Sequence, residues 1–119
     1  MKLEFHHINF VSENVNRMHD FYTSVLGLDD MKQEDFPRTE ATKDRGYSGQ
    51  IRFATEGNMQ MHLAERAFDV AFKNGQVLNP VERGHIAFRT DDLAAFLDVF
   101  NDKRIPFSDY GTTLSLIHI

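Results

Sequence analysis

Six polar residues form the candidate site of this chain. The candidate metal ligands are His7, His62 and His85. The candidate substrate-binding residues are Asn9, Arg52 and Gln60. Neutral imidazole is the commonest ligand of divalent transition metals, whereas the chain has no cysteine, which excludes thiolate metal sites and cysteine nucleophiles. The chemistry that these residues could do is therefore metal-assisted, through nitrogen ligands.

A repeat within the sequence places two of these histidines at equivalent positions. His7–Phe10 reads H-I-N-F, and His85–Phe88 reads H-I-A-F, at an offset of 78 (85 − 7). The register continues without a gap into the residues that follow, so that Met18 falls on Phe96. A period this long is too long for a solenoid and predicts two similar modules that face each other across a pseudo-twofold axis. Such an axis would bring His7 and His85 towards one centre.

Each module is predicted to run strand–helix–strand–strand–strand. Apolar residues at helical spacing follow both repeat motifs and predict two helices, the first ending at Gly27 and the second with Asp91 as its N-cap. The remaining predicted elements are a weak edge strand over 29–35, a loop over 36–48, a hairpin of strands 49–55 and 58–64, and a short linker helix over 65–73.

Alternation along the strands predicts which side chains lie on the face without helices. Successive strand residues point to opposite faces. If the apolar residues of each strand face the helices, all six candidate site residues take the other face, where Arg52 could hold an anionic substrate group. His6 is then expected to be structural. The competing interpretation is that this face is polar because water covers it, with Arg52 an ordinary surface arginine.

Composition limits the class of protein. The 119 residues are 41% hydrophobic and 26% charged, which is typical of one soluble globular domain. We divide it into a first module over 3–64, a linker over 65–82 and a second module over 83–119. A net charge of −5 argues against nucleic-acid binding, and no apolar run could span a membrane or serve as a signal peptide. We therefore expect a cytoplasmic protein that binds neither nucleic acid nor a membrane.

Several motifs together resemble one family. His7–Val11, then Phe21-Tyr22 and Leu26–Leu28, are similar to the opening of the glyoxalase/bleomycin-resistance/extradiol-dioxygenase group, the vicinal oxygen chelate superfamily. Gly84–Phe88 with Asp91–Leu93 is similar to the start of its second module, and Met59–Leu63 to its fourth strand. The resemblance implies an α+β fold of paired βαβββ modules whose curled mixed sheets form an open cup around a divalent metal.

The resemblance also implies which residues would hold that metal. His7 and His85 match the ligands from the first and fifth strands, and His62 matches a fourth-strand ligand of glyoxalase-like members. The metal would be Zn, Ni, Fe or Mn. The leading hypothesis is a glyoxalase-like lyase or isomerase that acts on a small oxygen-chelating substrate through an enediolate-type intermediate. The alternatives are an extradiol-type dioxygenase or thiol transferase on the same metal, and a metal-free binding protein of the bleomycin-resistance type.

The repeat leaves the second module incomplete. Residue 119 corresponds to residue 41 of the first module (119 − 78), so counterparts of residues 42–63 are missing, and so is the family's eighth-strand carboxylate. The segment Leu114–Ile119 can be the translation of a transposase end used in sequencing libraries, and we expect that it is not native. We therefore expect this chain to be impaired as an enzyme. A homodimer is also expected, because exposed sheet edges and family members favour one.

Overall fold

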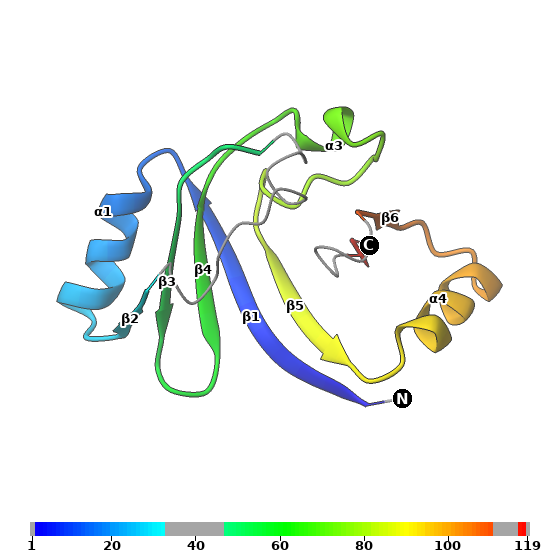
Figure 1. Cartoon of the computed structure of the whole chain (residues 1–119), viewed down its shortest axis with the longest axis horizontal. Helices are drawn as coiled ribbons and strands as arrows, with labels where there is room; N and C mark the ends of the chain where they lie inside the picture. The colour runs from blue at the N-terminus through cyan, green and yellow to red at the C-terminus, as the bar shows by residue number, and fades with distance from the viewer. Residues whose placement is uncertain (1, 33–46, 111–116, 119) are drawn as a thin grey trace.

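The computed structural model describes residues 2–32, 47–110 and 117–118 of the chain. Its main element is a curled, open sheet with the strand order β2-β3-β4-β1-β5 (Figure 1). The strands of this sheet are β1 (Leu3–Ser12), β2 (Asp29–Met31), β3 (Ile51–Thr55), β4 (Gln60–Glu65) and β5 (His85–Thr90). A separate two-stranded sheet consists of β6 (Ser108–Asp109) and β7 (Ile117–His118). The α+β class with a curled mixed sheet is confirmed.

The repeat has a direct structural counterpart between β1 and β5. The two strands are antiparallel, and Ile8 lies opposite Ile86, its own equivalent in the repeat. A local twofold axis therefore passes through this pair. The same axis relates the pair His7–Ala87 to the pair formed by His85 and Asn9. The predicted symmetry is thus built into the hydrogen-bonding register of the two strands.

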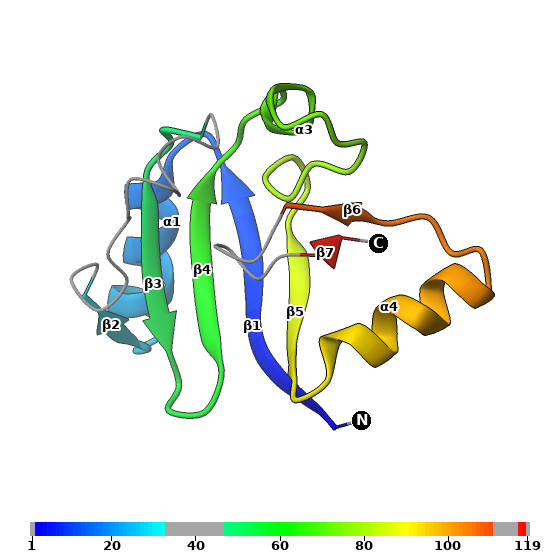
Figure 2. The same cartoon turned by 45° about the vertical axis from the view of Figure 1, so that its right-hand side comes forward.

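The first helix begins where a side chain caps it. α1 (Val15–Asp20) starts at Asn14, whose side chain accepts a hydrogen bond from the Arg17 amide. It continues as the π-helical turn η1 (Phe21–Val25) and covers one face of the sheet over β3 and β4 (Figures 1 and 2). α4 (Leu93–Asp102) lies beyond the β5 edge of the sheet (Figure 2).

Two local predictions about helices are corrected. The N-cap of α4 is Asp92, whose carboxylate accepts a hydrogen bond from the Ala95 amide, and not Asp91. The linker helix is only the single turn α3 (Val70–Lys73), because residues 65–69 first complete β4 and a bend. Most of the predicted 36–48 loop and most of the segment 114–119 lie outside the described residues.

Each face of the sheet contributes to burial. On the α1 side, Leu63 and Ala54 are fully buried, and Val15 of the helix that covers β3 and β4 is buried as well. On the opposite face, which we call the cup face, Ala64 packs with Val70, Val81 and Tyr110, so the linker closes the end of the cup. No helix within the described ranges is long and apolar enough to cross a membrane.

Candidate metal centre in the cup

The cup face brings the three candidate ligands together from three adjacent strands. His7 and Asn9 come from β1, His62 from β4 and His85 from β5. Register explains the grouping, because Asn9 lies opposite His62 on one side and opposite His85 on the other. The middle strand therefore presents its polar side chains between two histidines.

His7 and His85 meet through the ring nitrogens that a metal would use. Their Nε2 atoms are 3.3 Å apart. Two imidazoles that bind one tetrahedral Zn²⁺ at about 2.0–2.1 Å would have their nitrogens about 3.3–3.4 Å apart. The Nδ1 atom of His85 lies 2.9 Å from the Pro80 carbonyl oxygen, which is the backbone contact that orients many metal-binding histidines. The pair therefore fits a divalent metal in both spacing and donor type.

His62 is held differently from this pair. Its ring stacks on that of His7 with centroids 3.8 Å apart, and its Nε2 atom lies 2.8 Å from Oε1 of Gln60. Among the residues that the structure describes, no group of three or more His, Cys, Asp or Glu side chains has the arrangement of a metal site. The role of His62 as a third ligand stays a prediction, and Gln60 faces that histidine within the cup.

Burial favours the neutral form of two cup histidines, His62 and His85. It lowers the pKa of His62 to about 4, with smaller contributions from His6 and His85. Burial also lowers the pKa of His85, partly offset by its hydrogen bond to the Pro80 carbonyl. A neutral imidazole has the free lone pair that metal coordination requires. At neutral pH these side chains are therefore available as ligands without first losing a charge.

Asn9 carries an unsatisfied polar atom at the centre of the cup face. The residue is only 6% exposed, and its Oδ1 atom has no hydrogen-bond partner in the described part of the chain. A buried acceptor without a donor costs about 1–3 kcal/mol. This acceptor lies beside His62 and His85, and it can accept a hydrogen bond from a hydroxyl or amide group that enters the cup.

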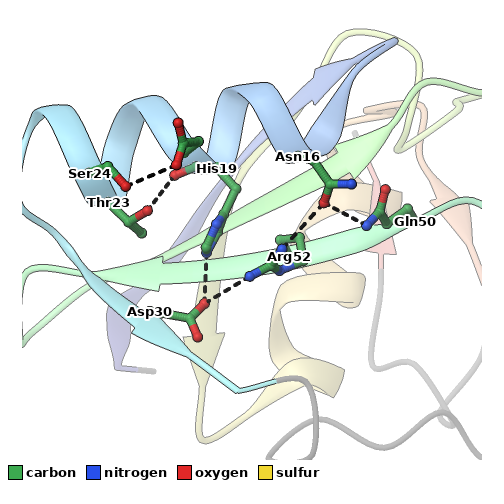
Figure 3. A network of polar contacts seen from close by, with 8 residues as sticks. Asn16, His19, Thr23, Ser24, Asp30, Gln50 and Arg52 are labelled. Atoms are coloured by element: carbon green, nitrogen blue, oxygen red, sulfur yellow. Dashed lines mark hydrogen bonds and ion pairs between the residues drawn. The ribbon is translucent and has the colours of Figure 1, made fainter.

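Arg52 lies on the opposite face from the histidines, which corrects its predicted position. In the β3–β4 hairpin Phe53 pairs with His62, whereas Arg52 pairs with Leu63 and faces α1. Its guanidinium lies 3.3 Å from Oδ1 of Asn16 and 3.6 Å from Oδ1 of Asp30 (Figure 3). Arg52 is therefore part of a polar network under α1 and does not line the cup.

Two further residues complete that network under the helix. Nε2 of His19, which is 6% exposed, lies 2.7 Å from Oδ1 of Asp30. Gln50 donates to Oδ1 of Asn16 over 2.8 Å (Figure 3). These contacts connect α1 to β2 and to the chain leading into β3, so the network holds the helix on the sheet.

His6 belongs to the cup although alternation predicts otherwise. The register between β1 and β5 shifts between Phe5 and His7, so His6 occupies a β-bulge. Its Nδ1 atom lies 2.8 Å from Nδ1 of His7, and its Nε2 atom lies 2.9 Å from a guanidinium nitrogen of Arg89. The only sequence signal for a place of His6 in the cup was that two histidines follow each other. A bulge lets two successive side chains share one face.

The fold and the site together define a class of protein. A curled open sheet carries two repeat-related imidazoles that meet beside its twofold axis, which is the plan of a paired-module, cup-shaped domain. The chain belongs to the Glyoxalase/Bleomycin resistance protein/Dioxygenase superfamily, whose sequence pattern matches residues 4–111.

Comparison with solved structures supports the same fold. The chain is similar to the crystal structure of the hypothetical protein BH1468 from Bacillus halodurans C-125, with a TM-score of 0.61 and 14% sequence identity. The match covers 92% of this chain and 75% of that one. None of the curated proteins compared with the chain matches it.

Proposed function

We propose that this chain has the site of a divalent-metal-dependent lyase or isomerase of the glyoxalase type, which acts on a small substrate that offers two neighbouring oxygen atoms. The observation that carries the proposal is the 3.3 Å contact between the Nε2 atoms of His7 and His85. This spacing suits two ligands of one metal ion and comes from repeat-equivalent positions.

The residues of the cup have distinct roles in this proposal. His7 and His85 hold the metal, which is Zn, Ni, Fe or Mn. When bound, such a metal acts as a Lewis acid that stabilises negative charge on a substrate oxygen. The Pro80 carbonyl keeps Nε2 of His85 directed into the cup, and the His62 ring supports that of His7 by stacking. Oδ1 of Asn9 accepts a hydrogen bond from a substrate hydroxyl and so orients the substrate.

Metal binding is the first test. Isothermal titration with ZnCl₂ is expected to give one site in the wild-type chain and at least a tenfold loss of affinity in His7→Ala and in His85→Ala. His19→Ala is the matched control, because His19 lies on α1, which covers the other face of the sheet, where its Nε2 atom contacts Asp30. Equal Zn²⁺ affinity in all four proteins would contradict the proposal.

The reaction class needs a separate test. An enediolate forms when a carbon next to a carbonyl loses a proton, so that hydrogen exchanges with deuterium in D₂O. Proton NMR of hydroxyacetone in D₂O is expected to show faster exchange with the Zn²⁺-loaded chain than with Zn²⁺-treated His85→Ala. Exchange at the same rate with both proteins would remove the lyase or isomerase assignment.

A metal-free binding protein is the second candidate. The observation that favours it is that the cup histidines contact one another and Gln60 in a self-consistent way without any metal. In that case His7 and His85 would line a pocket for an organic ligand. Metal analysis of the purified chain separates the two functions, because this second candidate requires less than about one-tenth equivalent of divalent metal even after incubation with excess Zn²⁺.

A further inference from the structure

One continuous line of polar contacts runs through the cup histidines from a guanidinium to a carbonyl. A guanidinium nitrogen of Arg89 lies 2.9 Å from Nε2 of His6, and Nδ1 of His6 lies 2.8 Å from Nδ1 of His7. Nε2 of His7 then lies 3.3 Å from Nε2 of His85, whose Nδ1 lies 2.9 Å from the Pro80 carbonyl oxygen. Three imidazoles in series therefore connect a group that only donates hydrogen bonds to a group that only accepts them.

The two ends impose the same direction on this line. Because Arg89 can only donate, Nε2 of His6 must be the unprotonated nitrogen, and the single ring proton of His6 is on Nδ1. That proton is donated to Nδ1 of His7, so His7 carries its own proton on Nε2. From the other end, the Pro80 carbonyl requires the His85 proton on Nδ1, which leaves Nε2 of His85 to accept from His7. Both derivations agree at the His7–His85 contact.

This arrangement conflicts with metal binding at one of the two ligands. A metal needs a bare Nε2 on His7, so the ring proton must move to Nδ1, where it faces His6. His6 must then accept on Nδ1 and carry its proton on Nε2, directly against the guanidinium of Arg89. Two donors would face each other at that point. His85 has no such conflict, because its Nε2 is already free of a proton.

We propose that Arg89 is a positioning residue that acts through His6 to hold His7 in the tautomer that cannot bind a metal, so that loading the cup requires Arg89 to leave His6. Arg89 can do so because it is exposed and lies next to the end of β5. The proposal rests on the function proposed above, in which His7 and His85 hold the metal. It adds a contact of Arg89 with His6, which we call the latch, that restrains the tautomer of His7 and leaves His85 unaffected.

The tautomers of the metal-free chain test the relay without any metal. Long-range ¹H–¹⁵N correlation spectra of the ¹⁵N-labelled wild-type protein distinguish the protonated from the bare nitrogen of each imidazole. We expect the proton on Nδ1 in His6, on Nε2 in His7 and on Nδ1 in His85. In Arg89→Ala the His7 pattern should shift towards the Nδ1-protonated form, which a merely structural role of Arg89 would not cause. A His7 ring protonated on Nδ1 in the wild-type chain would overturn the relay.

Zinc affinity tests the consequence of the relay. Arg89→Ala is expected to bind Zn²⁺ about three- to tenfold more tightly than the wild type, the size of one hydrogen bond. Arg17→Ala is the matched control for lost charge, because Arg17 lies on α1, which covers the other face of the sheet. In a His6→Phe background, which keeps a ring in the bulge, Arg89→Ala should change the affinity no more than Arg17→Ala does.

The outcomes separate the relay from the function on which it rests. Zn²⁺ binding with equal affinities for Arg89→Ala and Arg17→Ala overturns the latch and leaves the metal site intact. An effect of Arg89→Ala that persists in the His6→Phe background also overturns it, because Arg89 would then act without His6. Failure of every variant and of the wild type to bind Zn²⁺ overturns the proposed function and the latch together, whatever the tautomers are.

Discussion

Gly84 directly precedes β5 and packs against the backbone of β1 at Asn9, so replacing it should disturb the cup. Its φ angle is +92°, and a Cβ atom added there would overlap the backbone carbonyl oxygen of Asn9. This carbonyl oxygen belongs to the backbone of β1 and cannot rotate away as a side-chain atom could. Gly84→Ala must therefore push the two strands apart next to His85.

The loss of stability in Gly84→Ala has two parts, backbone strain and steric overlap, and a comparison with Gly27 separates them. A positive φ costs an alanine about 1–2 kcal/mol, and forcing extra volume into a packed contact costs about 1–3 kcal/mol more. Gly27 has a φ of +80° but nothing within 4 Å of an added Cβ. We therefore expect the free energy of unfolding to fall by about 2–5 kcal/mol in Gly84→Ala and by only about 1–2 kcal/mol in Gly27→Ala.

Urea unfolding followed by circular dichroism measures both variants against the wild type. If the slopes with urea are equal, the shift in midpoint gives the difference in stability. Zn²⁺ affinity should fall in Gly84→Ala, because His85 moves relative to His7, and should stay unchanged in Gly27→Ala. Equal destabilisation by the two substitutions would refute the reasoning, since only Gly84 faces a backbone atom.

Three further predictions concern protonation, the polar network and helix capping. His62 has a pKa of about 4 in the folded chain against 6.5 unfolded, so the unfolded state binds more protons and the free energy of unfolding falls as the pH drops from 6.5 to 4. The loss in the free energy of unfolding is at most about 3 kcal/mol. The urea midpoints at pH 7 and pH 4.5 should therefore differ less in His62→Leu than in the wild type. An equal difference in the two proteins would contradict this prediction. Arg52→Ala should leave the Zn²⁺ affinity unchanged, because the arginine lies outside the cup, and should lower the free energy of unfolding by less than about 1 kcal/mol. A tenfold loss of Zn²⁺ affinity in this variant would contradict the placement of Arg52 outside the site. In urea unfolding, Asp92→Ala should lower the free energy of unfolding by about 1 kcal/mol and Asp91→Ala by only a few tenths. The reverse order would show that Asp91 is the N-cap.

The symmetric part of the site could be predicted from the sequence because a repeat carries three-dimensional information. An offset of 78 that places His85 on His7 requires only that the two strands pair about their own axis, and the pairing of Ile8 with Ile86 does this. The same offset places Asp92 on Asn14, the cap of the first helix. The N-cap of the second helix could therefore have been predicted from the repeat, and local preference alone selected the wrong neighbour.

The rest of the site depends on register, which single strands do not reveal. Arg52 was expected in the cup because Phe53 is apolar, yet the hairpin register pairs Phe53 with His62 and puts both rings on the cup face, 4.8 Å apart. The cup is thus partly apolar at the position where polarity was expected. His6 was expected elsewhere because alternation assumes a regular strand, and the bulge breaks that assumption. In both cases a hydrogen-bonding pattern between strands decides the face, and hydrophobicity does not.

The twofold axis through Ile8 and Ile86 also has a consequence for how a bound molecule would sit. The two histidines are exchanged by this axis, so alone they cannot distinguish one end of a molecule from the other. Asn9 and Ala87 are exchanged by the same axis, and they differ: one side offers a buried amide oxygen and the other a methyl group. A molecule with one hydroxyl end and one apolar end would therefore bind in a single orientation. The orientation of a molecule in this cup would thus depend on the side-chain amide of Asn9, for which the second copy of the repeat has Ala87.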